Sequence, residues 1–71
     1  MTNSIYKVIE IIGSSPKSWE EAAQTAVEEA ASHLRDVRIA EVDELDMKVE
    51  GGKVTEYRAK VHVSFRYEAG A

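Results

Sequence analysis

Hydrophobic and polar positions change their period at a few points along the chain, and these points predict the secondary structure. Residues 4–12 are rich in β-branched side chains and are followed at residues 13–16 by Gly-Ser-Ser-Pro, a composition typical of a loop. The first strand is therefore predicted over residues 4–12. Ser18 is followed three residues later by Glu21, the spacing of a capping box, in which each side chain accepts a hydrogen bond from the other residue's backbone amide. A helix is predicted to begin there.

The segment after Ser18 has the period of an amphipathic helix. Acidic residues fall on one side, and the other side carries the small and apolar residues Trp19, Ala22, Ala23, Ala26, Val27, Ala30, Ala31 and Leu34. His33 and Arg35 come late, as the helix dipole favours for basic side chains. We expect the helix to end near Arg35 or Asp36, and its alanines to allow a close approach to a sheet.

Two further β-rich runs, residues 37–50 and 53–67, are separated only by two glycines, which predicts a hairpin. In the second run apolar and polar residues alternate, so the two faces of this strand are expected to differ. One face carries Tyr57, Ala59, Val61, Val63, Phe65 and Tyr67. The other carries Glu56, Arg58, Lys60, His62, Ser64 and Arg66. A strand with this pattern is expected in the middle of the sheet.

Centring the hairpin on Gly51 and Gly52 also predicts its register. The resulting pairs are Ile39 with Ser64, Leu45 with Arg58, and Met47 with Glu56. These three apolar side chains are then expected on the polar face of the last strand, pointing away from the helix.

Together these elements predict an α+β fold of the β-α-β-β type, as a single domain over residues 1–71. One helix packs on one face of a three-stranded antiparallel sheet in the order one, three, two. A core of this size seldom contributes more than about 3 to 5 kcal/mol, and one helix covers only one side of a sheet. We therefore expect a homo-oligomer. The alternative is a marginally stable monomer with ordinary exposed apolar side chains.

Composition narrows the functional classes. The 71 residues include no cysteine, and 9 Lys plus Arg stand against 13 Asp plus Glu, a net charge of −4. Because the cations are scattered, neither nucleic acid nor an anionic membrane surface is expected as a partner. No stretch approaches the roughly 18 apolar residues of a membrane helix, and residues 1–4 lack the features of a signal peptide. We expect a cytoplasmic protein.

Candidate catalytic chemistry is sparse. His33 near the helix end and His62 on the last strand have no recognisable partner pattern, so no enzyme is predicted. Trp19 is the only tryptophan and could stack on a flat aromatic ligand. Its place on the apolar stripe favours packing against the sheet edge or a neighbouring subunit.

Four carboxylates lie within six residues: Glu41, Asp43, Glu44 and Asp46. Hard cations such as calcium bind several carboxylate and carbonyl oxygens together. Strand alternation is expected to place the first two on one face and the last two on the other, so only a subunit junction could gather all four. The alternative is a set of ordinary ion pairs with Arg38, Lys48, Arg58 and Lys60.

Three stretches, residues 5–16, 18–22 and 61–66, together resemble the dodecin family, and the likeness covers nearly the whole chain. The resemblance implies a β-α-β-β fold and hollow spheres of twelve subunits, whose best known members store flavins in pairs between subunits. In those members a tryptophan on the second strand stacks on the flavin, and a glutamine on the last strand hydrogen-bonds its polar edge. The matching positions here are Ile39 and Arg58.

Both flavin contacts thus differ, since an isoleucine has no π-face and an arginine replaces an amide with donors and a charge. Residues 19–20, 37–40, 46–47 and 63–65 look closer to a non-flavin branch, the calcium dodecins. The resemblance implies a non-enzymatic homododecameric shell that holds a small ligand or a divalent cation, with calcium as the first expectation. Flavin (FMN or riboflavin) at altered contacts and a purely structural shell are the alternatives.

Overall fold

The predicted β-α-β-β order is confirmed by the computed structural model, which describes residues 3–67. The first two and last four residues of the predicted 1–71 domain lie outside the described residues. The elements are β1 (Tyr6–Ser15), α1 (Trp19–His33), β2 (Val37–Glu50) and β3 (Lys53–Arg66). The strands form one antiparallel sheet in the order β1-β3-β2, as expected for an α+β fold with the last strand in the middle.

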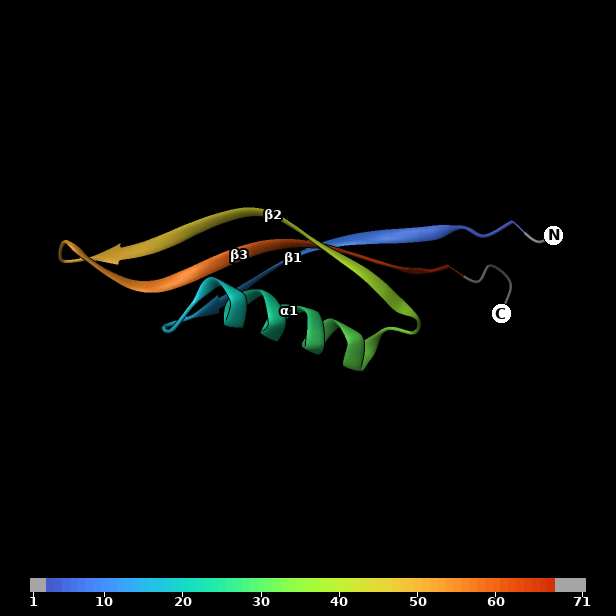
Figure 1. Cartoon of the computed structure of the whole chain (residues 1–71), viewed down its shortest axis with the longest axis horizontal. Helices are drawn as coiled ribbons and strands as arrows, with labels where there is room; N and C mark the ends of the chain where they lie inside the picture. Colours follow the sequence, from blue (N-terminus) through green and yellow to red (C-terminus); the bar gives the residue numbers. More distant parts are fainter. Residues whose placement is uncertain (1–2, 68–71) are drawn as a thin grey trace.

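Helix α1 lies along one face of the sheet, and the β2-β3 hairpin and the start of β1 extend beyond it (Figure 1). The chain measures 55 × 19 × 16 Å, and its radius of gyration of 14.8 Å exceeds the value of about 11 Å expected for a compact domain of this length. One helix therefore leaves much of the sheet uncovered. Below, the face that α1 covers is the inner face, and the opposite face is the outer face.

Small side chains fill the space between α1 and the inner face. The buried apolar residues are Ala22, Ala26, Ala30, Ala59, Val61 and Val63. They confirm the middle of the predicted stripe of the helix and of the predicted apolar face of the last strand, whereas Ala31 of that stripe is exposed. None of these six is larger than valine, so the two layers lie close together. Within residues 3–67 no helix has the length and hydrophobicity needed to cross a membrane.

Strand β1 continues past residue 12, where a loop was predicted, and that part of the prediction is wrong. Gly13 lies opposite Ala59 and continues the ladder with β3. A Cβ at Gly13 would overlap the carbonyl oxygen of Ala22 and lie 2.9 Å from the Cβ of Ala26. The glycine therefore permits the close approach of the helix. Close approach of another part of the backbone is a common reason for glycine within a strand.

One half of the predicted capping box is present at the start of α1. The backbone N–H of Glu21 donates to Ser18 Oγ at 3.0 Å. The Glu21 carboxylate does not return to the Ser18 amide, because the buried Ser15 stands between them. Ser15 Oγ donates to Glu21 Oε2 at 2.5 Å and accepts from the backbone N–H of Lys17 at 2.9 Å and of Ser18 at 3.4 Å. This hydroxyl ties the end of β1 to the start of α1.

Helix α1 ends at His33, slightly before the predicted end near Arg35 or Asp36. The backbone N–H of Leu34 still donates to Ala30 O at 2.9 Å, but Leu34 itself has an extended backbone. Asp36 has a φ of 54°, in the left-handed region that aspartate tolerates better than most residues. The chain reverses over the three residues between the end of α1 and the start of β2.

The pairing of β2 with β3 shifts at three β-bulges beyond the hairpin turn. The residues left without a partner are Thr55 on β3, and Asp43 and Arg38 on β2. Because the bulges at Thr55 and Asp43 lie on opposite strands, the second restores the register that the first displaces. Ile39, which lies beyond both, is opposite Ser64, so this predicted pair is confirmed.

Between these two bulges the predicted register is wrong. Leu45 lies opposite Ala59, and Met47 lies opposite Tyr57, instead of opposite their polar neighbours. A slip of one residue exchanges the faces of a strand. Leu45 and Met47 therefore align with the inner-face residues of β3, and only Ile39 of the three aligns with the outer face.

We expect Gly13→Ala to lower the free energy of unfolding by about 1–3 kcal/mol, the usual range for an overpacked core. Loss of unfolded-chain entropy would by itself stabilise this variant by about 0.4–1 kcal/mol, but the new Cβ overlaps the backbone of Ala22, which cannot rotate away. Denaturant unfolding at fixed protein concentration measures the change. Ser14→Ala, the next residue along β1, is the control, and equal stability of the two variants would contradict the close approach.

Candidate functional site

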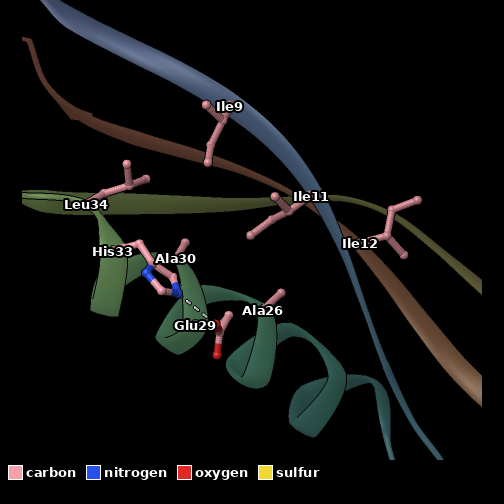
Figure 2. A pocket seen from close by; sticks show the side chains of 8 residues that line it. All are labelled: Ile9, Ile11, Ile12, Ala26, Glu29, Ala30, His33 and Leu34. Atoms are coloured by element: carbon pink, nitrogen blue, oxygen red, sulfur yellow. Dashed lines mark hydrogen bonds and ion pairs between the residues drawn. The ribbon is translucent and has the colours of Figure 1, made fainter.

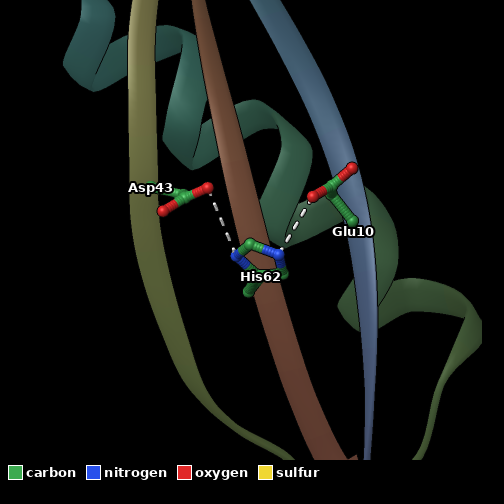
Figure 3. A group of neighbouring side chains, drawn as sticks. All are labelled: Glu10, Asp43 and His62. Carbon is green, nitrogen blue, oxygen red and sulfur yellow. Dashed lines mark ion pairs between the residues drawn. The ribbon is translucent and has the colours of Figure 1, made fainter.

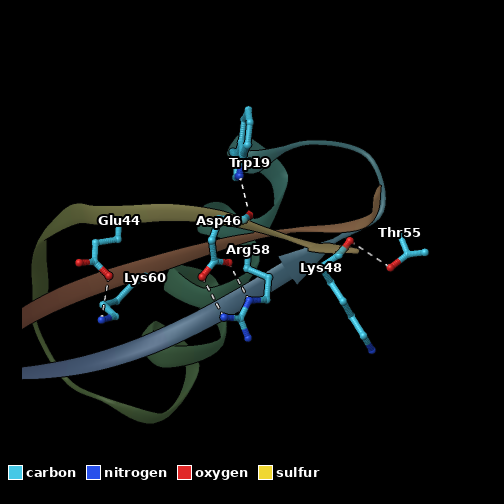
Figure 4. Close-up of polar contacts among 7 residues, drawn as sticks. All are labelled: Trp19, Glu44, Asp46, Lys48, Thr55, Arg58 and Lys60. Carbon is cyan, nitrogen blue, oxygen red and sulfur yellow. Dashed lines mark hydrogen bonds and ion pairs between the residues drawn. The ribbon is translucent and has the colours of Figure 1, made fainter. Parts of the chain in front are cut away.

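Polar side chains of β3 meet carboxylates of β2 on the outer face of the sheet. Lys60 Nζ lies 3.0 Å from Glu44 Oε1. Arg58 donates two hydrogen bonds to Asp46, from Nε to Oδ1 at 2.7 Å and from Nη2 to Oδ2 at 2.9 Å (Figure 4). A bidentate pair of this kind fixes direction as well as distance. For Glu44 and Asp46 the structure therefore shows the ion pairs that the sequence left as an alternative to metal ligation.

These pairs shift the pKa values of Asp46, Arg58 and Lys60. The hydrogen bond from Arg58 is the main reason that the pKa of Asp46 lies below its ordinary value of 3.8. The hydrogen bond to Glu44, followed by the charge of that carboxylate, raises the pKa of Lys60. Both pairs are exposed to solvent, so salt screens them and they contribute little to stability. Their main effect is to hold the side chains in fixed positions on the outer face.

His62 lies between two carboxylates that come from the two neighbouring strands (Figure 3). Its Nε2 is 3.0 Å from Glu10 Oε2 on β1, and its Nδ1 is 4.0 Å from Asp43 Oδ2 on β2. One ligand atom from each of the three residues lies within 4.8 Å of the others. The side chain of His62 is 31% exposed and those of Glu10 and Asp43 are 51% and 45% exposed, so the group is accessible from solvent.

All four carboxylates of the predicted metal set belong to the outer face. The prediction that they divide between two faces is wrong, because the bulge at Asp43 interrupts the alternation of β2. Their neighbours across the ladder are His62 for Glu41, Lys60 for Glu44 and Arg58 for Asp46. The four do not converge on one point, since two are held in ion pairs and Asp43 is the member that joins the group around His62.

Glu10 is the member of the His62 group that the sequence reasoning missed. It lies on β1 directly opposite His62. A signal was present, because Glu10 interrupts an apolar run and must point to the face opposite Ile9 and Ile11. That signal identifies an outer-face carboxylate, but the neighbour of Glu10 follows only from the register of β1 with β3.

Ile39 and Arg58, the positions matched to flavin contacts, lie far apart on the outer face. The hollow beside Ile39, of about 470 Å³, is also lined by Val8, Ala40, Glu41, His62 and Ser64. Another hollow, of about 550 Å³, is lined by Ile12, Ser14, Met47, Lys48, Glu56 and Arg58. Because Ile39 lies opposite Ser64, the two positions are separated by about 20 Å at about 3.3 Å per residue. One chain therefore does not bring both to a single ligand.

Trp19 packs against the sheet at its edge strand β2. Packing against the sheet edge was one of the two arrangements predicted for it, the other being contact with a neighbouring subunit. Trp19 Nε1 donates to the carbonyl oxygen of Asp46 at 3.0 Å (Figure 4). Its ring meets that of Tyr57 edge-on, with centroids 5.0 Å apart. Beside it, Val42 and Leu45 line an apolar hollow of about 420 Å³. The hydrogen bond holds the backbone of Asp46 while Arg58 holds its side chain.

An apolar groove of about 410 Å³ runs between β1 and the C-terminal half of α1 (Figure 2). Its lining residues are Ile9, Ile11, Ile12, Ala26, Glu29, Ala30, His33 and Leu34. The polar pair in this lining is His33 and Glu29, with 2.9 Å between Nε2 and Oε2. The groove is thus a largely apolar surface that α1 leaves open at the edge of the sheet.

The fold and the site define a class of small β-α-β-β proteins, with one alanine-lined helix on the inner face and an open, charged outer face. The sequence model of the Dodecin family matches residues 5–68. The chain therefore belongs to the dodecin family, as the resemblance in its sequence indicated.

Sequence relatives and solved structures agree with this assignment. The chain is 55% identical over 64 residues to calcium dodecin of Mycobacterium tuberculosis, with 89% of each chain covered. It is 34% identical to dodecin of Thermus thermophilus, and the match covers 90% of this chain and 93% of the relative. Dodecin from Streptomyces coelicolor superimposes with a TM-score of 0.90 at 31% identity, covering 99% and 100%. The M. tuberculosis structure is described as a calcium-chelating antigen with a novel calcium-binding site. It superimposes with a TM-score of 0.83 at 49% identity, and the match covers 96% of this chain and 97% of that one.

We expect Asp46→Asn to lower the melting temperature slightly at neutral pH, and this difference to vanish in acid. A carboxyl whose pKa is lowered by folding stabilises the folded state above its unfolded pKa, and the effect is lost as pH falls through the folded value. Because the pKa of Asp46 is lowered from its ordinary value of 3.8, its contribution to stability is lost as the pH falls below 3.8. Melting curves from about pH 7 to about pH 2 check this, with Glu28→Gln on α1 as the charge-matched control. A difference that persists at the lowest pH would contradict the role of the Arg58 pair.

Proposed function

We propose that this protein forms a homododecameric shell that holds a divalent cation, with calcium as the first candidate. Membership of the dodecin family and the 55% identity to a protein named calcium dodecin support this proposal. In this proposal the shell is non-enzymatic, and its ligand is held where copies of the chain meet.

The uncovered sheet is the observation that carries the proposal. On the outer face Val8, Ile12 and Ile39 are 55%, 53% and 65% exposed. On the inner side, beside the start of α1, Val42 and Leu45 are still 50% and 51% exposed. Burying such surface between copies contributes about 25 cal/mol per Å², which a core of small residues cannot supply within one chain. The open apolar groove beside β1 offers a further place for a neighbouring copy.

The charge of the shell supports the choice of a cation. Twelve copies at −4 each would carry −48, which attracts cations to the assembly. Calcium takes about six to eight oxygen ligands, more than the outer face of one chain supplies at any point. We propose Glu41 and Asp43 as ligands, completed by carboxylates of neighbouring copies. Glu44 and Asp46 would first have to release the side-chain cations that they hold.

Flavin binding is the second candidate, and the hollow beside Ile39 favours it. Val8 and Ile39 provide apolar contact there, and His62 and Ser64 provide polar atoms. Without an aromatic ring at Ile39 the stacking energy of about 1–3 kcal/mol is missing, which corresponds to roughly tenfold or more in affinity. Arg58 would have to come from another copy, because of its distance from Ile39 within one chain.

We expect the purified protein to have a mass of about 95 kDa, twelve times the 7.9 kDa of one chain. The physical reason is the apolar surface that a single copy leaves in water. Light scattering on the eluting peak of a sizing column measures the mass. Well-folded single chains that resist heating at low concentration would contradict the shell.

We also expect calcium to raise the melting temperature of chelator-treated protein, and Asp43→Asn to reduce this shift. A ligand that binds only the folded state stabilises it by about 2.7 kcal/mol when present at about 100 times its dissociation constant. Glu28→Gln, on the exposed side of α1, is the matched control. A dodecamer whose melting temperature does not rise with calcium would support the shell and contradict calcium as its ligand. A yellow protein, or one that quenches riboflavin fluorescence at micromolar concentration, would support flavin instead.

A further inference from the structure

We propose that Glu10, Asp43 and His62 form a binding site for a divalent transition metal of the zinc class, one ion per chain. The site lies within a single chain, so it does not depend on the number of subunits in the shell. It also differs from the proposed calcium site in having a nitrogen ligand, which calcium does not favour.

The distances in the group suit one small ion after a modest change. A tetrahedral zinc ion with bonds of about 2.1 Å separates its ligand atoms by about 3.4 Å. Glu10 Oε2 and His62 Nε2 are 3.0 Å apart, close to that separation. The selected ligand atoms of all three residues lie within 4.8 Å of one another. Asp43 Oδ2 lies 4.0 Å from Nδ1, the other ring nitrogen, so the imidazole and the exposed Asp43 carboxylate must both turn before one nitrogen and the two carboxylates bind the same ion.

The donor types select the class of ion. A neutral imidazole with two carboxylates balances the charge of a divalent ion, and imidazole nitrogen suits zinc, cobalt and nickel. Three protein ligands leave a fourth position for water, the arrangement of open zinc sites. Calcium would need several more oxygen atoms. We therefore expect a clear preference for the transition metals over calcium at this point.

The sheet positions the three ligands before any ion arrives. Each comes from a different strand, and the ladder holds Glu10 opposite His62. The bulge at Asp43 allows this residue to join His62 while the next residue, Glu44, binds Lys60. Bulges commonly redirect a side chain in this way, and ligands on strands are held more firmly than ligands on loops.

His33 provides the matched comparison within the same chain. It also lies 2.9 Å from a glutamate, Glu29, but both belong to one turn of α1. His62 differs because a second carboxylate faces its other ring nitrogen. An imidazole that only forms an ion pair would bind metal no better than His33 does.

The test is equilibrium binding of zinc and cobalt(II) to chelator-treated full-length protein, with visible absorption of the cobalt form reporting its coordination. We expect one ion per chain, a cobalt spectrum of four-coordinate type, and at least a tenfold loss of affinity in His62→Ala. Glu10→Gln should weaken binding to a similar extent without a change of size, and circular dichroism checks that each variant is folded. His33→Ala should bind as the unchanged protein does.

Two results would overturn the proposal: no saturable binding of zinc or cobalt by the unchanged protein, or equal affinity in the His62 and His33 variants. Calcium titrations of the same proteins separate this site from the calcium proposal. His62→Ala should lose zinc and keep the calcium shift. If the unchanged protein bound zinc but was not stabilised by calcium, that result would contradict calcium storage and leave the zinc-class site in place.

Discussion

The hydrogen-bond register between β2 and β3 is the constraint on which the rest of the structure depends. Bulges at Thr55 and Asp43, on opposite strands, displace the ladder between them by one position and then restore it. Within this stretch every side chain of β2 takes the face opposite to the one that a regular ladder would assign. The displacement brings Leu45 to the inner side beside Trp19 and aligns Asp46 with Arg58 on the outer side.

The helix meets the sheet through small residues, and this closeness limits what the helix can cover. Gly13 and Ala22 approach so nearly that no side chain fits between them, and the buried core contains nothing larger than valine. Close packing of this kind covers only part of the sheet. A helix of fifteen residues is shorter than a strand of fourteen, because each residue rises less in a helix than in a strand, so the sheet extends past both ends of the helix. The incomplete cover explains why a small, elongated chain keeps apolar side chains in water on both faces, as a subunit of a larger assembly would.

On the outer face, electrostatics follows the central strand. Arg58 and Lys60 each hold one carboxylate of β2, and both remain charged at any physiological pH. His62 occupies the next outer-face position, but it has two carboxylates beside it. It is therefore the position in this row where an external cation can bind without displacing a lysine or an arginine side chain.

The sequence by itself determined the order of elements, the alanine stripe, the Gly51-Gly52 turn and the alternation of the last strand, because each depends on contacts between residues close together in the chain. It also indicated the family and the outer-face position of Ile39. Only the tertiary structure decided the face of Leu45 and the partners of Glu10 and His62. The physical reason is that the step of three residues from Val42 to Leu45 breaks the period of the strand without showing how the ladder realigns, while a neighbour across a sheet is chosen by the pairing of strands far apart in the chain.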